Sequence, residues 1–265
     1  MNKEKREQMR WFLTDKVRKV VDWRHTDQYN GLPAPPLQKP APEGSQTVTL
    51  PGPTHWRGLG EIPLSQAIAQ RKSRRVFTDT PLNLEELAFL LWSTQGVRHQ
   101  VGPHTAFRTV PSAGGRHPFE TYVVALRVEG LERDIYRYLP LDHELLPLKA
   151  GASKDEQDSA NEGPSSLEAR LVEAALGQGF CGKSAATFVW TTIPYRTEWR
   201  YDLAAYRVIP MDAGHLCQNL YLACEGVGAG TCAVAAYDQE KMDELLGVDG
   251  FDEFTLYLAP VGKLT

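Results

Sequence analysis

The sequence predicts an α+β layered fold, in which helices cover a sheet built from a few buried strands. Residues 120–128 and 185–193 are rich in β-branched and aromatic side chains, and both stretches are too apolar for strands with one face in water. Residues 134–138 and 144–146 flank a turn, as in a β-hairpin. Helical segments interleaved with hairpin-like strands favour the α+β class.

Composition and charge restrict the class of protein and the partners that it can bind. The 265 residues are 42% hydrophobic, which suffices for one large core or two small domains. A net charge of −4 argues against a protein that binds nucleic acid or a membrane surface, because such binding needs an excess of basic residues over a whole face. No apolar run approaches the roughly 20 residues of a membrane span, and the charged start lacks a signal core, so we expect a cytoplasmic protein. The four cysteines form no C-x-x-C pair and indicate neither a disulfide framework nor a metal site.

The first 60 residues are predicted to form a helix and an extended arm. Residues 4–23 place apolar side chains at helical spacing between charges, which predicts an amphipathic helix of about five turns. Residues 30–63 hold eight prolines and no sustained periodicity, so they should run extended along a surface. We therefore divide the chain into an N-terminal helix and proline-rich arm, 1–60, and a main domain, 61–265.

The main domain is predicted to begin with two helices. Pro63 opens a short one, and Asn83 with Glu86 forms a capping box for a second that ends near Gly96. Residues 150–166 are polar and predict a mobile surface loop. The further elements expected, in chain order, are the strand 120–128, the hairpin 134–146, a helix at 167–176, the strand 185–193, a long apolar helix at 209–227, a short helix at 242–246 and a strand at 254–258.

Four cations and a hydroxyl group gather at residues 71–75, where the first of these helices ends. A phosphate group with about −1.5 to −2 charges would gain charge-assisted hydrogen bonds here, which arginine gives in pairs. The alternative is a solvated basic corner, and this stretch alone favours it. The other motifs of the chain favour the anion site.

Two stretches of small residues leave room for a flat ligand close to the backbone. One is P-S-A-G at 111–114, before a buried strand, and the other is A-V-A-A at 233–236, after glycines that end the long helix. A tight turn is the alternative for the first. Ser112 is not expected to be a nucleophile, because the first glycine of G-x-S-x-G is missing. The glycines of 226–230 follow a helix and not a strand, so they are no dinucleotide loop.

Residues 196–207 crowd arginines and aromatic side chains into one segment. A solvated helical face with aromatic anchors is the alternative to a site there. His117 and His215 have no partner at motif spacing, so we expect both to be structural.

Four motifs, R-K-S-R-R-V-F, P-S-A-G-G-R-H-P, M-D-A-G-H-L-C-Q-N-L-Y-L-A and G-A-G-T-C-A-V-A-A-Y-D, occur in this order. Together they resemble the FMN-dependent nitroreductase superfamily, and specifically its SagB/ThcOx-type dehydrogenase branch, over about residues 64–262. The resemblance implies a nitroreductase-like fold with a mixed or antiparallel central sheet flanked by helices. It also implies a homodimer that holds two FMN molecules in the subunit interface and transfers hydride through flavin N5.

The resemblance assigns cofactor-binding residues. It implies three groups: Arg71, Lys72, Ser73 and Arg75 on the FMN phosphate and ribityl chain, Pro111, Ser112, Ala113 and Gly114 reaching the flavin from the partner subunit, and the amides of Val234, Ala235 and Ala236 at flavin N5 and O4. Lys263 is the one candidate for a basic phosphate-binding tail. Gly115 and His117 replace the Asn and Gln of many nitroreductases, which favours the SagB-like branch.

The resemblance also assigns a catalytic pair. Aligned on Tyr206-Arg207, Arg200 and Tyr201 take the place of a Lys-Tyr pair that handles the proton in azoline-oxidising relatives. Because a guanidinium keeps its proton, we expect Tyr201 to act as acid or donor and Arg200 to orient an anionic substrate.

Three functions stay open at this point. The first is an FMN-dependent SagB-type dehydrogenase that transfers hydride between flavin N5 and a small or peptide-borne substrate, with azoline-to-azole oxidation as one candidate reaction. The second is a nitro or quinone reductase with NAD(P)H as electron donor. The third is a non-catalytic flavin-fold scaffold of a peptide-modifying complex, docked through the N-terminal arm.

Overall fold

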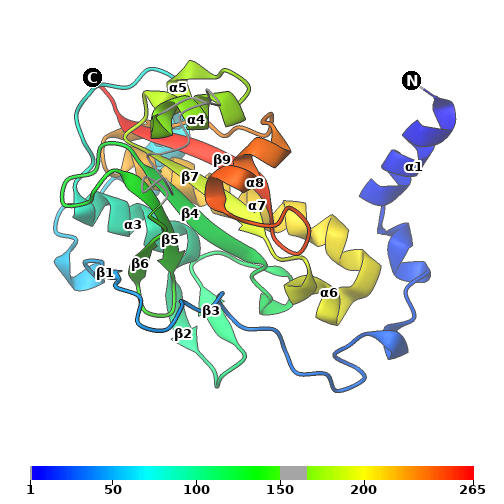
Figure 1. Cartoon of the computed structure of the whole chain (residues 1–265). Helices are drawn as coiled ribbons and strands as arrows, with labels where there is room; N and C mark the ends of the chain where they lie inside the picture. The colour runs from blue at the N-terminus through cyan, green and yellow to red at the C-terminus, as the bar shows by residue number, and fades with distance from the viewer. Residues whose placement is uncertain (1, 150–165) are drawn as a thin grey trace, which may run out of the picture.

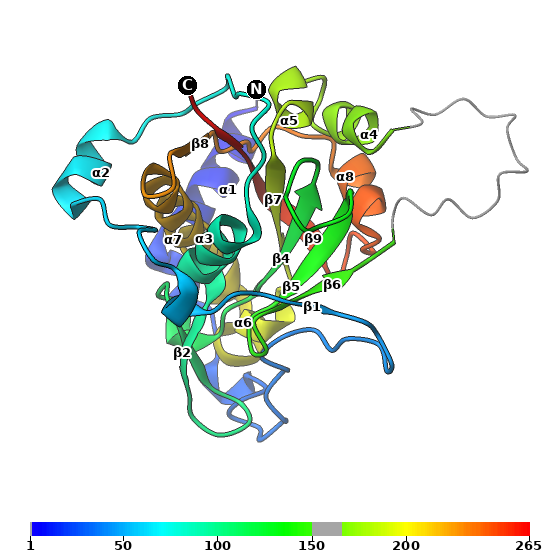
Figure 2. The same cartoon turned by 90° about the vertical axis from the view of Figure 1, so that its left-hand side faces the viewer.

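A seven-stranded sheet forms the centre of the computed structural model, which describes residues 2–149 and 166–265 (Figures 1 and 2). Its strands are β1 (Val48–Thr49), β4 (Phe119–Ala125), β5 (Asp134–Leu139), β6 (Glu144–Pro147), β7 (Ala186–Thr192), β8 (Ala229–Thr231) and β9 (Phe254–Lys263). Their order is β1-β6-β5-β4-β7-β9-β8, with every neighbouring pair antiparallel. The predicted α+β class, with a central sheet flanked by helices, is confirmed. The polar stretch 150–165 lies outside the described residues.

Helices cover both faces of this sheet (Figure 2). The α-helices of the described residues are α1 (Lys3–Leu13), α2 (Leu64–Gln70), α3 (Leu84–Gln95), α4 (Leu167–Ala174), α5 (Gly179–Gly182), α6 (Tyr195–Tyr201), α7 (Ala205–Glu225) and α8 (Gln239–Leu246). The predicted capping box is present at α3, where Asn83 Oδ1 accepts from Glu86 N at 2.8 Å and Glu86 Oε2 accepts from Asn83 N at 3.1 Å. Both α3 and the predicted helix α2 begin and end where their local signals place them.

The two central strands are buried along their whole length, as predicted. Every residue of β4 and β7 is buried, and successive side chains alternate between the two faces. Phe119 and Val123 pack against the core beneath α3 and α7, whereas Tyr122 and Val124 pack against the core beneath α4 and α8. The sheet therefore separates two cores.

The N-terminal helix is shorter than predicted, and the expectation of one helix over residues 4–23 is wrong. Helix α1 ends at Leu13, because Thr14 adopts an extended conformation with ψ of 157°. The Thr14 hydroxyl donates to the Trp11 carbonyl (2.7 Å) and caps the short 3₁₀ helix that follows. No residue of α1 is buried, and Figure 1 shows α1 standing apart from the sheet. The buried anchor lies further along the chain, where Val17 packs on α6 and α7 through Tyr201 and Ala204.

The arm runs along the surface, as predicted, and also completes the sheet. Its strand β1 pairs with β6 through Val48 and Leu145, so it forms one edge. Leu37 and Leu50 of the arm are buried. The arm is thus tied to the main sheet, while the division of the chain at residue 60 stays a prediction.

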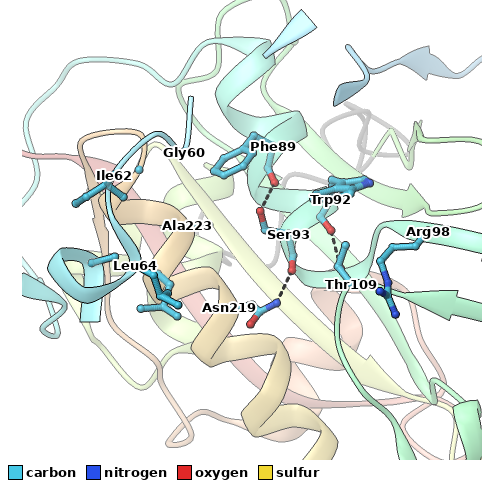
Figure 3. A pocket seen from close by; sticks show the side chains of 13 residues that line it. Gly60, Ile62, Leu64, Phe89, Trp92, Ser93, Arg98, Thr109, Asn219 and Ala223 are labelled. Atoms are coloured by element: carbon cyan, nitrogen blue, oxygen red, sulfur yellow. Dashed lines mark hydrogen bonds between the residues drawn. The ribbon is translucent and has the colours of Figure 1, made fainter. Parts of the chain in front are cut away.

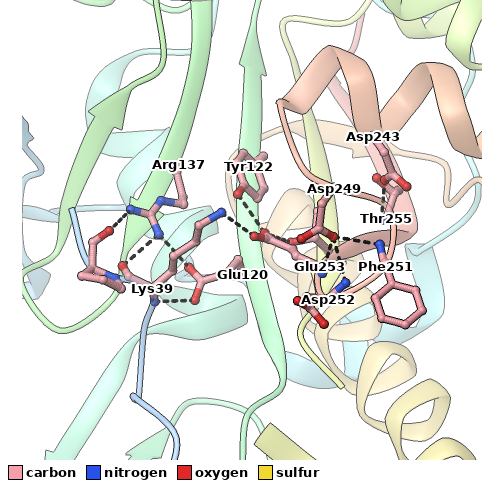
Figure 4. A network of polar contacts seen from close by, with 12 residues as sticks. Lys39, Glu120, Tyr122, Arg137, Asp243, Asp249, Phe251, Asp252, Glu253 and Thr255 are labelled. Atoms are coloured by element: carbon pink, nitrogen blue, oxygen red, sulfur yellow. Dashed lines mark hydrogen bonds and ion pairs between the residues drawn. The ribbon is translucent and has the colours of Figure 1, made fainter. Parts of the chain in front are cut away.

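A buried network of charges clasps the arm to the sheet (Figure 4). Glu120 of β4 is 2% exposed, and its carboxylate lies 2.5 Å from Arg196 Nη2 and 3.8 Å from Arg137 Nη1. Glu120 also accepts from Lys39 N (2.8 Å), and Arg137 donates to the Lys39 carbonyl (2.8 Å). Lys39 Nζ lies 2.5 Å from Glu253 Oε2. We call these five residues the clasp, because each cation in it has a carboxylate partner within the fold.

Strands β1 and β8 were not predicted from the sequence, and neither were two further strand regions. A separate hairpin of β2 (Val97–Gln100) and β3 (Ala106–Arg108) projects from the body, and β2 is mostly exposed with no apolar alternation. Strand β9 continues to Lys263 through Pro260 and Gly262, two residue types that strands disfavour. Gly262 is required there, since a Cβ atom would lie 2.6 Å from the Phe77 ring.

Candidate active site

The basic stretch after α2 lies beside the segment that follows β8. Arg74 N donates to Thr231 O (2.8 Å), and Ser73 pairs with Thr231 as in a parallel sheet. A Cβ atom on Gly230 would lie 2.5 Å from Arg74 Cγ, so only glycine allows this approach. Two predicted motifs, distant in the sequence, thus meet. We call residues 71–75 together with 231–236 the basic cradle.

Tyr221 joins the two halves of the basic cradle. Its hydroxyl lies 2.9 Å from Ser73 Oγ and accepts from Ala233 N at 2.9 Å. The Arg71 guanidinium lies over its ring, 5.1 Å from the centroid. Tyr221 comes from α7, where the sequence analysis did not identify it as a site residue.

The cations of the basic cradle have no carboxylate partner within the described part of the chain. Arg74 Nε is buried and has no hydrogen-bond partner among the described residues. Arg75 lies over the Phe180 ring at 5.8 Å, with Lys72 exposed beside it. A phosphate group would supply the missing charge, and guanidinium and ammonium donors suit its oxygens. The basic cradle therefore fits the phosphate end of FMN.

The predicted amide donors at 234–236 are not equivalent. Val234 N donates to Leu258 O (2.8 Å), so the sheet already uses this amide and the prediction for Val234 as a flavin donor is not supported by its geometry. Ala235 and Ala236 are exposed on the same loop. Lys263 Nζ lies 2.6 Å from Glu86 Oε1 and donates to Val227 O (2.6 Å). Its charge is thus balanced within the fold, which disfavours the predicted contact with phosphate.

A second group of predicted residues meets at the other end of α7. Gly114 has φ of 58°, and a Cβ atom on it would lie 2.5 Å from Tyr201 Oη and 3.0 Å from Arg200 Cδ. Ala113 N donates to Asp212 Oδ2 (3.1 Å), and Ser112 Oγ accepts from His117 N (2.9 Å). The loop of small residues thus packs directly on the predicted catalytic pair.

Asp212 holds this loop from α7, although the sequence analysis did not propose it. It is 5% exposed, and burial raises its pKa, an effect that hydrogen bonds from Ser112 and Ala113 oppose. His215 Nδ1 lies 3.8 Å away. A lone carboxylate among apolar helix residues such as Ile209 and Ala213 was the available signal.

The arm covers the predicted catalytic pair and leaves a pocket of about 330 Å³. Gln28 N donates to Trp199 O (2.8 Å), and Trp199 Nε1 donates to Leu32 O (3.0 Å). The lining residues are Trp23, Thr26, Gln28 and Tyr29 from the arm and Arg200 and Tyr201 from α6. We call this cavity the arm pocket.

The surroundings of His117 favour the predicted structural role, because they make its ring a weak base. It is 5% exposed, with φ of 47°. Burial and then the charge of Arg108 lower its pKa to about 3. The ring is therefore neutral in the folded protein.

The basic cradle and the arm pocket lie at different places along α7. Tyr221 and Asp212 are nine residues apart, which corresponds to about 13 Å along a helix. The structure brings together 71–75 with 231–236, and 111–114 with Arg200 and Tyr201, but it does not join the two groups within one chain. The predicted approach of 111–114 to a flavin from the partner subunit stays a prediction.

A third cavity, of about 480 Å³, contains no predicted site residue (Figure 3). It lies between the arm and helices α3 and α7, with Phe89, Trp92 and Leu64 among its apolar walls. Its polar groups are already paired, for example Asn219 Nδ2 with Ser93 O at 2.9 Å. This surface offers an apolar face and no set of reactive groups.

The described part of the chain shows no disulfide bond and no cluster of metal-ligating side chains. The four cysteines are free and buried. Across residues 2–149 and 166–265, no group of His, Cys, Asp or Glu side chains could hold a metal ion. Over the same residues, no helix has the length and apolar character needed to cross a membrane.

Comparison with known proteins finds one family that matches most of the chain. A family model described as "Nitroreductase family" matches residues 68–263. A protein of Methanocaldococcus jannaschii assigned as a nitroreductase is 32% identical over 205 residues, which cover 77% of this chain and 93% of the relative. The trifolitoxin-processing protein TfxB of Rhizobium leguminosarum is 29% identical over 150 residues, covering 55% of this chain and 37% of the relative.

Two solved structures share the fold. One is a protein of Ralstonia eutropha assigned as a nitroreductase, with a TM-score of 0.60 and 23% identity over 88% of this chain and 99% of that one. The other belongs to the Escherichia coli microcin synthetase McbBCD complex with truncated pro-MccB17 bound, with a TM-score of 0.57 and 19% identity over 93% of this chain and 83% of that one. The sheet and its flanking helices are thus a nitroreductase-like fold.

Proposed function

Since the chain belongs to the nitroreductase family, we propose that it is an FMN-dependent oxidoreductase of the SagB-type branch that acts on a small or peptide-borne substrate. Membership of the family makes it an oxidoreductase. The observation that carries the choice of FMN is the basic cradle, where Arg71, Lys72, Arg74 and Arg75 have no carboxylate partner among the described residues. An anionic cofactor would supply that partner.

A peptide-borne substrate is favoured by the relative TfxB, whose name states that it processes trifolitoxin. The fold itself is compatible with such a substrate, because the McbBCD complex was solved with truncated pro-MccB17 bound. Azoline-to-azole oxidation is the reaction that we propose within this class.

The proposal assigns roles to the main residues of the site. Bound FMN supplies a hydride acceptor or donor at N5. Arg71 and Arg75 hold the phosphate, and Tyr221 keeps Ser73 and the 231–236 loop in register. The Tyr201 hydroxyl takes up or gives the proton, beside the small Gly114. We also propose a homodimer, in which 111–114 and Tyr201 of one subunit complete the site of the other.

A nitro or quinone reductase with NAD(P)H as donor is the second candidate. It is favoured by the M. jannaschii relative, which matches nearly its whole length and is assigned as a nitroreductase. The third candidate, a non-catalytic scaffold, would need no flavin.

The visible spectrum of the purified chain and one turnover assay separate these candidates. A flavin spectrum, with slow turnover of NADPH plus a nitroarene and oxidation of an azoline-containing peptide, supports the proposal. Fast turnover of NADPH and nitroarene without peptide oxidation supports the second candidate. A colourless chain that takes up no added FMN rejects both and supports the scaffold.

A further inference from the structure

The arm pocket combines an aromatic wall with a free positive charge. Trp23 and Tyr29 of the arm face Arg200 and Tyr201 of α6 across about 330 Å³. The wall is held in place, because Tyr195 Oη donates to Asp27 Oδ2 (2.7 Å) and Val17 and Val21 of the arm pack near Tyr201. A preformed pocket of this kind binds a flat ligand at low entropic cost.

The charge of Arg200 is not balanced within the fold. Among the residues described, it forms no ion pair and no hydrogen bond, and its guanidinium lies 5.6 Å from the centre of the Tyr201 ring. A solvated arginine would need no partner, so Arg200 alone does not identify a ligand.

Arg116 places a second cation near Arg200, although it does not line the arm pocket. This side chain is 6% exposed, and its guanidinium lies over the Trp199 ring, 4.9 Å from the centroid. It forms no ion pair in the described part of the chain, and its Nε is buried without a hydrogen-bond partner. Burial first, and the charges of Arg200 and Arg196 next, lower its pKa. Arg196 is paired with Glu120, whereas Arg116 and Arg200 have no carboxylate between them. Two neighbouring cations, one of them buried, raise the free energy of the folded chain unless an anion lies nearby.

We infer that the arm pocket binds a flat ring carrying a carboxylate, with Arg200 as its charged partner and Trp23 and Tyr29 as its walls. This inference rests on the proposed function, in which Tyr201 acts on the substrate. It gives the N-terminal arm a role in substrate selection and restricts the proposed substrate to one that places a carboxylate beside its flat ring.

The test is calorimetric binding of three probes to the purified full chain: 4-nitrobenzoate, the neutral 4-nitrobenzamide, and acetate, which lacks the ring. We expect 4-nitrobenzoate to bind about ten- to a hundredfold tighter than 4-nitrobenzamide, since one charge-assisted contact has this value, and acetate not to bind measurably. Equal affinity for the acid and the amide would overturn the inference, and this comparison needs no variant.

Variants locate the binding to the arm pocket. Arg200→Gln should reduce the preference for the acid to within about twofold, and Trp23→Ala should weaken both nitro probes about fivefold. Trp11→Ala is the matched control, because Trp11 lies on exposed α1 outside the pocket. If Trp23→Ala bound as well as Trp11→Ala, the pocket would be excluded. A chain that refuses FMN but keeps the preference for the acid would refute the proposed function alone, and a flavin-loaded chain without that preference would refute this inference alone.

Discussion

The clasp and the basic cradle both gather cations, but only the clasp balances them. In the clasp, Arg137 and Arg196 share the Glu120 carboxylate. Lys39 pairs with Glu253 (Figure 4). In the basic cradle, the cations of residues 71–75 have no such partner among the described residues, and Arg74 Nε is buried without an acceptor. In the first arrangement every cation has a carboxylate partner, although Arg196 Nη1 is buried without a hydrogen-bond partner, whereas the cations of the second have no carboxylate partner among the described residues.

This difference separates structural from ligand-binding arginines. A buried charge is costly unless it is paired, so the clasp must stay intact for the arm to stay attached. An unpaired and partly exposed cation costs little while solvated, and it contributes mainly when an anion arrives. We therefore expect substitutions in the clasp to lower the stability of the fold, and those in the basic cradle to lower affinity for the cofactor.

The largest effect is expected from breaking the clasp. Glu120→Gln leaves Arg196 buried beside a neutral side chain, which should lower the free energy of unfolding by about 3–5 kcal/mol. Urea denaturation measures the loss. Glu129→Gln is the control, because Glu129 is exposed and its side chain forms no hydrogen bond or ion pair within the described residues, and it should change stability by less than about 0.5 kcal/mol. Equal losses in both variants would show that the clasp has no structural role.

Tyr201→Phe tests the predicted catalytic pair at the end of α6. If Tyr201 transfers the proton, oxidation of an azoline-containing peptide should slow about a hundredfold while reduction of the flavin by NADPH stays unchanged. Stopped-flow measurement separates the two half-reactions. Tyr206→Phe is the control, since a hydrogen bond to Glu198 raises the pKa of Tyr206 to about 12, which keeps its hydroxyl protonated near neutral pH and makes it a poor proton donor. An equal loss in both half-reactions would mean that Tyr201 has only a structural role.

Arg75→Ala tests whether the basic cradle contributes to FMN affinity and not to stability. Removal of one charge-assisted contact should weaken FMN about ten- to a hundredfold, as measured by fluorescence titration, and leave the stability of the FMN-free chain unchanged. Arg57→Ala, at an exposed arm position without an ion pair in the described residues, should leave both quantities unchanged. If Arg75→Ala lowered the stability of the chain but not its affinity for FMN, the basic cradle would not differ from the clasp.

The smallest effect, when it is counted per pH unit, concerns His117. The folded-state pKa of His117 is about 3, against an ordinary value of 6.5, so the unfolded chain takes up a proton over this range and the folded chain does not. The stabilisation is present above pH 6.5 and is lost as the pH falls, with a slope of up to about 1.4 kcal/mol per pH unit. His117→Asn tolerates the positive φ and should show a shallower slope in urea denaturation between pH 6.5 and 4. Parallel slopes in the two proteins would contradict the buried neutral state.

Local signals were sufficient for much of the fold. The capping box of Asn83 and Glu86 and the unbroken apolar runs of β4 and β7 predicted these elements, because each depends on neighbours in the sequence. Helix α1 was predicted too long, since a side-chain hydroxyl at Thr14 ends it without glycine or proline. The β2–β3 hairpin was missed because its strands are short and polar.

The candidate site was predictable only in part. Residue types and a resemblance identified Arg71–Arg75, 111–114 and Tyr201, but not how they are grouped in space. Tyr221, Asp212 and Arg116 were missed, because their roles depend on contacts between distant segments. Lys263 was proposed for its charge, and Glu86 neutralises it.

Parallel titrations of the purified chain with FMN and with riboflavin test the central claim most directly. The two ligands share the flavin ring and differ in the phosphate group, which the basic cradle is proposed to bind through Arg71 and Arg75. Loss of two charge-assisted contacts predicts that riboflavin binds at least about a hundredfold more weakly than FMN. Equal affinity for both ligands would contradict a phosphate site in the basic cradle, and failure to bind either would contradict a flavin enzyme.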